Sequence, residues 1–227
     1  MMVRLKGVSH THSAGTPWAR PALHDINLRF MAGDRVLITG ANGSGKSTLA
    51  WILAGLSAPS EGIAERDGES LVDEADDIGM LLQHTRLQLL RPTVAAELGA
   101  FGCSPERIRW AVEQIGFPLS TLERPIDSLS VGQQRRVGLA VLLARGLPFM
   151  VLDEPMAGLD PAARTQLVQA IDRLPLTTTI VTVTHDLVDS APLGTRVIEL
   201  AAGRIVSDSE NPAVTVAVAP AVDRSSA

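Results

Sequence analysis

The chain has 227 residues, 45% of them hydrophobic and 20% charged, which suffices for the core of one large domain or of a domain with an inserted lobe. The formal net charge of -5 argues against a nucleic-acid-binding protein, because such proteins usually concentrate basic side chains on one face. The single cysteine, Cys103, excludes an internal disulfide and fits a reducing compartment.

The first third of the chain predicts strands followed by one helix. Val3 and Leu5 alternate with polar residues, and Ile26, Leu28 and Phe30 do so again, which is typical of half-buried strands. The apolar run Arg35 to Thr39 ends at Gly40, and Lys46 to Leu56 has the character of a helix. A strand, a glycine-rich loop and a helix in this order predict the start of a parallel α/β unit.

The middle of the chain predicts a short strand, Ile78 to Gln83, and then a helical lobe over residues 84–135. A second buried helix is expected from Val131 to Ala144. The longest apolar stretch, Val137 to Leu152, is interrupted by charged and turn-forming residues and is shorter than the roughly 20 residues of a membrane-spanning helix. We therefore expect any role at a membrane to require partner subunits.

Strands return towards the end of the chain. Phe149 to Asp153 and Thr178 to Thr184 are apolar, and Asp160 is placed to cap the helix between them. A closing hairpin is expected from Arg196 to Val206, and residues 208–227 are predicted to form a flexible tail. The fold expected is α/β, with a mainly parallel sheet and one cassette over residues 1–207.

Residues 40–48 match the pattern G-x-x-x-x-G-K-[ST] between the predicted strand and helix. Backbone N–H groups of such a loop surround phosphates, the lysine neutralises them, and the serine hydroxyl binds Mg²⁺. The loop predicts an ATP and Mg²⁺ site formed by Gly40, Asn42, Gly43, Ser44, Gly45, Lys46, Ser47 and Thr48.

Two adjacent acids, Asp153 and Glu154, end the apolar strand that begins at Phe149. Downstream of a phosphate-binding loop, Asp153 is expected to hold Mg²⁺ and Glu154 to act as the general base on the attacking water.

The segment Leu129-Ser-Val-Gly-Gln-Gln134, together with these two motifs, resembles the ABC-transporter ATP-binding cassette, whose signature reads Leu-Ser-Gly-Gly-Gln. Val131 stands where that family has its first glycine. The resemblance implies a P-loop NTPase fold with an inserted helical subdomain and an N-terminal antiparallel β subdomain. It also implies that Ser130, Gly132 and Gln133 bind the γ-phosphate of ATP held by a second ATPase subunit, either another copy or a paralogue.

Three further residues match family motifs in the expected order. The resemblance gives Gln83 contact with Mg²⁺ and a relay to the membrane partner, places Asp160 in the loop along the dimer seam, and gives His185 contact with the γ-phosphate. The catalytic group so implied is Lys46, Gln83, Glu154 and His185.

The family usually stacks adenine on an aromatic side chain, often tyrosine, and this chain has no tyrosine. His12 occupies that position, and Trp18 is the alternative. A metal pair formed by His10 and His12 has no third ligand in view.

The segment from Gln83 to Gly102, with a second glutamine at Gln88, a Thr-Val-x-x-acid sequence and a Phe-Gly, resembles the energy-coupling-factor subgroup. That subgroup powers uptake of vitamins such as biotin or cobalamin, or of cobalt and nickel ions. The resemblance implies a transmembrane partner, a substrate-binding membrane subunit and a place on the cytoplasmic face of the membrane. Other ABC importers or exporters, and soluble ABC ATPases, are the alternatives.

Overall fold

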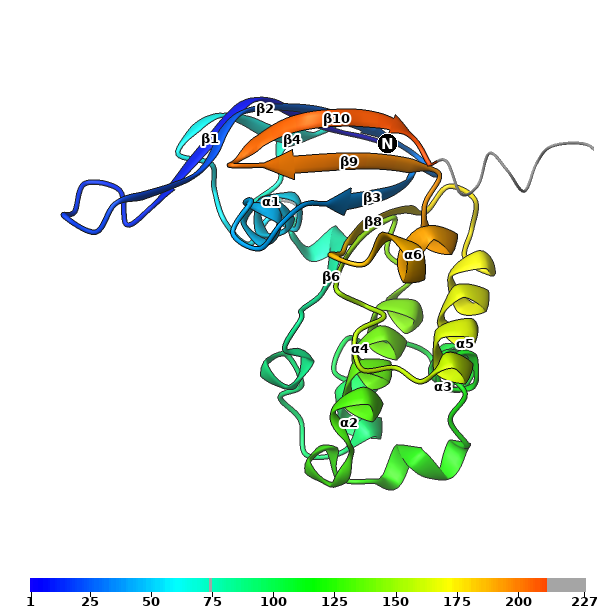
Figure 1. The fold of residues 1–227 in the computed structure, drawn as a ribbon. Coiled ribbons are helices and arrows are strands. Elements are labelled where there is room, and N and C mark those ends of the chain that lie inside the picture. Colours follow the sequence, from blue (N-terminus) through cyan, green and yellow to red (C-terminus); the bar gives the residue numbers. More distant parts are fainter. Residues whose placement is uncertain (74, 212–227) are drawn as a thin grey trace, which may run out of the picture.

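The computed structural model describes residues 1–73 and 75–211. Two sheets lie in layers with a helix between them, and a group of helices extends away from the larger sheet (Figure 1). In the described residues the strands are β1 (Met2–His12), β2 (Arg20–Met31), β3 (Arg35–Thr39), β4 (Glu61–Arg66), β5 (Glu69–Ser70), β6 (Ile78–Leu81), β7 (Phe149–Asp153), β8 (Thr179–Val183), β9 (Arg196–Ala201) and β10 (Arg204–Glu210). The helices are α1 (Lys46–Leu53), α2 (Val94–Gly99), α3 (Pro105–Gln114), α4 (Val131–Arg145), α5 (Pro161–Asp172) and α6 (Leu187–Ser190), with short 3₁₀ turns between them.

The smaller sheet is antiparallel and has the strand order β2-β1-β4-β5. Val3 pairs with Phe30 and Leu5 with Leu28, so the alternating apolar residues of both strands face the same side. The connection between β1 and β2 projects beyond the body of the protein (Figure 1). This sheet is the predicted N-terminal antiparallel β subdomain.

The larger sheet has the order β10-β9-β3-β8-β7-β6 and is parallel except at the β9–β10 hairpin. Its central strands β3, β7 and β8 are short and buried on both faces, as parallel strands covered by other layers must be. The carboxyl ends of β3, β6, β7 and β8 therefore meet at one edge, where the candidate site lies.

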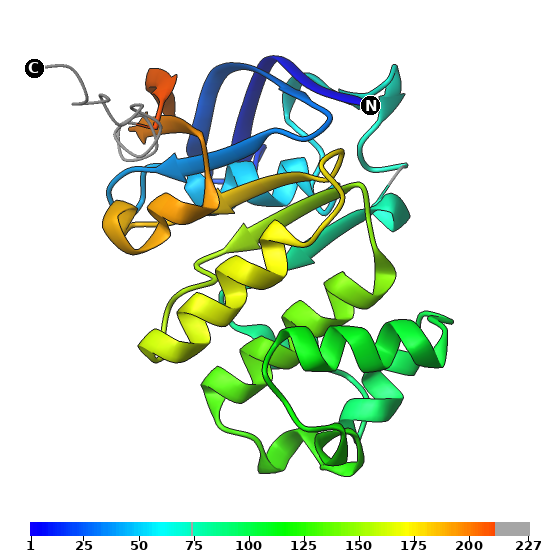
Figure 2. The same cartoon turned by 90° about the vertical axis from the view of Figure 1, so that its right-hand side faces the viewer.

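Two hydrophobic cores occupy the two faces of the larger sheet. One joins it to α1 and the smaller sheet through residues such as Phe30, Leu49 and Phe149. The other joins it to α2, α3, α4 and α5 through residues such as Leu139 and Leu167. The view turned by 90° shows α4 and α5 lying below the strands (Figure 2). The predicted α/β, P-loop NTPase fold with an inserted helical subdomain is confirmed.

Strand β10 extends past residue 207, the predicted end of the cassette. It pairs with β9 as far as Glu210, and Asp208 accepts two hydrogen bonds from the Arg196 guanidinium on β9, each 2.7 Å long. The last residues of this strand are polar, so they show no alternation of apolar and polar residues that would predict a strand. The rest of the predicted tail, residues 212–227, lies outside the described residues.

Helix α4 runs past residue 135, the predicted end of the helical lobe, to Arg145. It contacts the lobe helices α2 and α3 and also strand β6 of the larger sheet, so one continuous helix joins the two parts. We propose that the lobe begins after β6 and merges with the sheet layer along α4. Among the described residues no helix is long and apolar enough to span a membrane.

Candidate nucleotide site

A cavity of about 630 Å³ opens at the carboxyl edge of the larger sheet. It brings together residues that lie far apart in the sequence: the loop after β3, the end of β6, the end of β7 and the residue after β8. Its lining is His12, Arg20, Pro21, Ala22, Asn42, Gly43, Gly45, Lys46, Ser47, Thr48, Gln83, Asp153, Glu154 and His185. The predicted catalytic and metal-binding side chains therefore share one cavity.

The loop between β3 and α1 takes its shape from glycines in the left-handed region. Gly40 has φ 142°, and a Cβ there would lie 2.1 Å from the Leu200 carbonyl oxygen. Gly45 has φ 104°, and its Cβ would lie 2.6 Å from the Ala22 carbonyl oxygen. These contacts require glycine, and they turn the N-terminus of α1, with its free N–H groups, towards the cavity.

Lys46 is buried, and its ammonium donates to the carbonyl oxygens of Gly40 at 2.7 Å and Ala41 at 3.0 Å. An ammonium has three donors, so this arrangement holds the cation in the loop and leaves one donor for an anion. Ser44 is buried beneath the loop, whereas Ser47 and Asn42 are exposed at the cavity. The loop is thus built for a phosphate group.

Asp153 is buried at the end of β7. Burial raises the pKa of this carboxyl from 3.8 to about 6, and the adjacent Glu154 adds to the increase, while Lys46, Arg135 and His84 oppose it. Keeping this buried carboxyl ionised costs free energy, and a bound cation would offset that cost.

Glu154 has a left-handed backbone, with φ 53°, which is strained for a residue with a side chain. Its N–H donates to the Val183 carbonyl oxygen at 2.9 Å, so β8 holds the strained residue in place. Its Oε1 accepts hydrogen bonds from the His185 backbone N–H at 2.9 Å and from His185 Nδ1 at 2.6 Å. The bond to Glu154 raises the pKa of His185, so a protonated imidazole paired with the carboxylate is favoured.

The oxygen donors expected to hold Mg²⁺ face the same cavity. They are the Asp153 carboxylate, the Ser47 hydroxyl and the Gln83 side-chain amide. Magnesium prefers hard oxygen ligands and keeps several waters or phosphate oxygens, so a small protein donor set fits this ion. In the described part of the chain no group of three or more His, Cys, Asp or Glu side chains could form an all-protein metal site.

His12, at the end of β1, lines the cavity, and its Nε2 lies 3.1 Å from the Thr48 hydroxyl on α1. Its ring meets the His10 ring edge-on, with centroids 4.8 Å apart. Trp18 is 74% exposed and is absent from the cavity lining. The geometry therefore favours His12 over Trp18 as the ring beside a bound base.

The remaining predicted residues lie outside this cavity. Ser130 and Gln133 cap the N-terminus of α4 reciprocally, through the Gln133 N–H to Ser130 Oγ at 3.3 Å and the Ser130 N–H to Gln133 Oε1 at 3.0 Å. Gly132 lies in the first turn of the same helix, and Asp160 caps α5 by accepting from the Ala163 N–H at 2.8 Å. None of the four lines the nucleotide cavity of its own chain.

Four residues of the site were not predicted from the sequence. Arg20, Pro21 and Ala22 reach the cavity from the start of β2, and Arg135 on α4 is buried beside Glu154. Burial lowers the pKa of the Arg135 guanidinium, and the carboxylates of Glu154 and Asp153 oppose that effect. No local motif marks these residues, because hairpin pairing and helix packing bring them to the site.

A family model described as ABC transporter matches residues 23–157, which include the phosphate-binding loop, the signature segment and both acids. The chain belongs to the ABC transporter family. The predicted family is thereby confirmed, and the cassette is an ABC ATPase whose nucleotide is ATP.

The curated relatives of this cassette are ATP-binding proteins. An uncharacterized ABC transporter ATP-binding protein of Mycobacterium tuberculosis is 41% identical over 211 residues, which are 90% of this chain and 30% of the relative. The chain thus spans less than a third of that relative's length. The energy-coupling factor transporter ATP-binding protein EcfA2 of Streptococcus pyogenes is 35% identical over 224 residues, which are 91% of this chain and 80% of the relative.

Solved structures resemble the cassette over most of its length. The ATP-binding cassette MJ0796, in a dimeric post-hydrolysis state bound to ADP and Pi, has a TM-score of 0.81 at 28% identity, covering 92% of this chain and 98% of its own. The protein cbiO1 from Clostridium perfringens, part of the ABC transporter complex cbiONQ, has a TM-score of 0.76 at 27% identity, covering 94% and 90%.

Proposed function

We propose that this chain is the ATP-hydrolysing subunit of an energy-coupling-factor importer. In this proposal it acts in a dimer of cassettes, either with a second copy or with a paralogue. A separate transmembrane subunit would carry a vitamin such as biotin or cobalamin, or a cobalt or nickel ion, assisted by a substrate-binding membrane subunit. The cassette would then lie at the cytoplasmic face of the membrane through these partners.

The observation that carries the proposal is that the residues predicted to bind ATP lie in two separate places within one chain. The phosphate loop, Glu154 and His185 face one cavity, whereas Ser130 and Gly132 lie outside it at the start of α4. A second subunit related by two-fold symmetry would place its own α4 over this cavity and complete the site. The similarity to dimeric MJ0796 supports this arrangement.

The importer assignment rests on the segment after Gln83 and on the EcfA2 and cbiO1 relatives. Leu87 and Leu90 are 73% and 80% exposed, whereas Leu89 is buried in the core of the lobe. Gln88 folds back, and its Oε1 accepts the Leu82 N–H at 2.8 Å, which fixes the turn that presents Leu87. The two exposed leucines follow Gln83 closely in the sequence, and we assign the docking of the transmembrane partner to them.

In the reaction, a water attacks the γ-phosphate, and Glu154 accepts its proton while the bond to the bridging oxygen of ADP breaks. Lys46 and the N–H groups of the loop hold the phosphates, and His185 would contact the γ-phosphate from the position where Glu154 holds it. Ser47, Gln83 and Asp153 would hold Mg²⁺, which when bound neutralises negative charge on the phosphates. His12 would stack on the adenine.

The experiment is Glu154→Gln in the full chain. It keeps the shape of the side chain and removes the base, so ATP hydrolysis should fall by about 100-fold or more while ATP still binds. An ATP-dependent dimer should then accumulate, measured by light scattering after size exclusion. Glu97→Gln is the matched control, since Glu97 is a buried carboxylate on α2 that accepts the Arg91 N–H at 2.7 Å, away from the cavity. A Glu154→Gln protein that hydrolyses ATP at the normal rate would show that another group is the base.

Other ABC importers and exporters would give the same result in that experiment, and so would a soluble ABC ATPase. Recovery of the chain with a transmembrane subunit from detergent-solubilised membranes separates the transporter subunit from a soluble ATPase. Replacing the two exposed leucines, Leu87 and Leu90, with serine should abolish that recovery without changing ATP binding.

A further inference from the structure

Arg135 makes an unusual set of contacts for an arginine on the second turn of a helix. The residue is only 6% exposed, and its guanidinium donates to three backbone carbonyl oxygens. Nη1 donates to Glu154 at 2.7 Å and also to Ala157, and Nη2 donates to Gln83 at 2.5 Å. The three acceptors belong to two separate segments, one following β6 and one following β7.

Each acceptor lies in a part of the chain with its own role at the nucleotide site. Gln83 follows β6 and lines the cavity, Glu154 is the proposed base, and Ala157 lies in the turn that leads towards α5. Glu154 has the strained φ of 53°, and its peptide N–H and carbonyl are both held, the first by β8 and the second by Arg135. Arg135 therefore helps to hold a residue that would otherwise relax to an ordinary backbone conformation.

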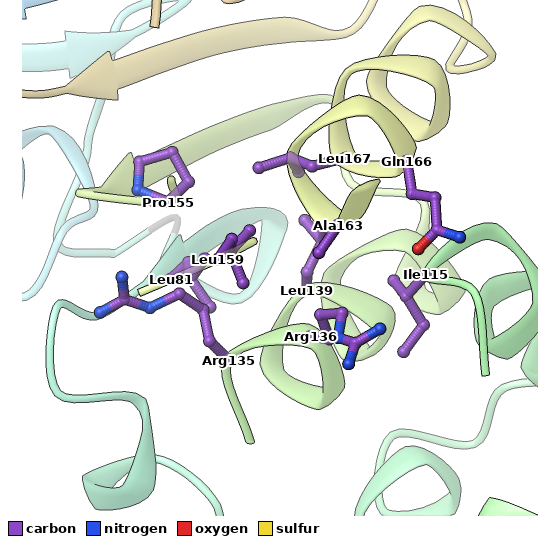
Figure 3. Close-up of a pocket in the computed structure, with 10 residues that line it drawn as sticks. All are labelled: Leu81, Ile115, Arg135, Arg136, Leu139, Pro155, Leu159, Ala163, Gln166 and Leu167. Atoms are coloured by element: carbon purple, nitrogen blue, oxygen red, sulfur yellow. The ribbon is translucent and has the colours of Figure 1, made fainter. Parts of the chain in front are cut away.

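Of the two adjacent arginines on α4, Arg135 is the one that faces the segments after β6 and β7. Figure 3 shows the Arg135 guanidinium on the side of Leu81, pointing away from the guanidinium of the neighbouring Arg136. Arg136 instead lies over the Phe117 ring, 4.3 Å from its centroid. Both arginines line a pocket between α4, α5 and the segment after Glu154. Its volume is only about 10 Å³, so these parts of the chain pack closely together.

Ser130 caps the N-terminus of α4, where the proposed function places the γ-phosphate of the partner's ATP. We propose that Arg135 is a positioning residue that links this helix end to Glu154 and Gln83 of the same chain. Through it, ATP bound at the signature of one subunit sets the geometry of that subunit's own hydrolytic site. The two ATP sites of a dimer are then coupled within each chain as well as across the interface. This inference rests on the proposed function.

The test compares Arg135→Gln, Arg135→Lys and a control, Arg107→Gln, in the full chain. Arg107 also bonds to α4, donating to the Ala144 carbonyl at 2.7 Å and the Leu143 carbonyl at 2.9 Å, but at the far end of the helix. The measurements are kcat, KM and the Hill coefficient for ATP, the melting temperature, and hydrogen–deuterium exchange of the amides in residues 154–158.

We expect Arg135→Gln to lower kcat by about tenfold or more, with little change in KM, because a small displacement of a catalytic group is costly. The Hill coefficient should fall towards 1, and the amides of residues 154–158 should exchange faster. Arg135→Lys should not rescue these values, since an ammonium lacks the planar fork that reaches three carbonyls. Arg107→Gln should lower the melting temperature but leave kcat, the Hill coefficient and this exchange unchanged.

The inference would be overturned if Arg135→Gln kept the wild-type kcat, Hill coefficient and exchange. Full rescue by Arg135→Lys would also overturn it, because a single buried positive charge would then be sufficient. The same loss in Arg107→Gln would show that general stability of α4 is the cause. A wild-type chain without ATPase activity would refute the proposed function instead. The exchange of residues 154–158 then decides the role of Arg135, since faster exchange in the glutamine variant supports the link and equal exchange overturns it.

Discussion

Asp153→Asn should stabilise the nucleotide-free protein at neutral pH while removing its activity. The folded protein raises the pKa of Asp153 from 3.8 to about 6, so ionising this buried carboxyl opposes folding. Each pH unit corresponds to about 1.4 kcal/mol, and the full cost is therefore about 3 kcal/mol. Asparagine has nearly the same shape and no charge, so it should recover most of that free energy.

The raised pKa of Asp153 determines how its contribution to stability changes with pH. Between pH 3.8 and about 6 the folded state binds more protons at Asp153 than the unfolded state does, so this residue makes stability fall as pH rises. The advantage of the asparagine variant should thus be absent below pH 3.8, grow across this window and remain constant above it.

Urea denaturation without nucleotide or Mg²⁺, from pH 4 to pH 8, measures the difference directly. Loss of ATP hydrolysis in the same variant would agree with a carboxylate kept at a cost to stability because it binds a cation. If the variant were no more stable than the wild type at pH 8, or if the difference did not change with pH, the argument from burial would be wrong.

Three other predictions concern single contacts. His12→Ala should weaken ATP binding, measured by fluorescence titration, while His12→Phe keeps it; equal loss in both would mean that the bond to Thr48 matters and stacking does not. Gly33→Ala should destabilise the protein by more than Gly68→Ala in urea, because both have positive φ but only Gly33 would place its Cβ 2.3 Å from the Leu176 carbonyl oxygen; equal effects would contradict this. Gly132→Ala should cost less stability than Gly33→Ala, because Gly132 has an ordinary helical φ and its Cβ would lie 3.1 Å from the Gly158 carbonyl oxygen, a contact that a shift of a few tenths of an ångström relieves; an equal or larger loss would refute this packing argument.

The sequence was most informative where function depends on consecutive residues. The phosphate loop is one continuous segment whose glycines must adopt φ values that other residues avoid, so its pattern survives in the sequence. The place of Asp153 and Glu154 at the end of β7 was predictable because a buried parallel strand is an uninterrupted apolar run.

Contacts made across the fold could not be predicted in this way. Arg20 reaches the cavity only because β1 and β2 pair with His12 opposite Arg20. Arg135 and Arg136 are adjacent identical residues, yet one contacts the catalytic segments and the other an aromatic ring. Which of two such arginines faces the site depends on the rotation of α4 against the sheet, and the sequence alone does not determine that rotation.

The substitution at Val131 shows how far one chain can explain its own signature motif. Val131 is 77% exposed, so within this chain its position tolerates a side chain, whereas Gly132 faces the Gly158 carbonyl oxygen at close range. The chain's own fold thus favours a small residue at position 132. Any requirement at position 131 must come from what covers that exposed surface, and in the proposed dimer this is the nucleotide held by the other subunit. A valine there would contact the partner's ATP or loop directly, and for this reason the choice of partner, copy or paralogue, would depend on the shape opposite Val131.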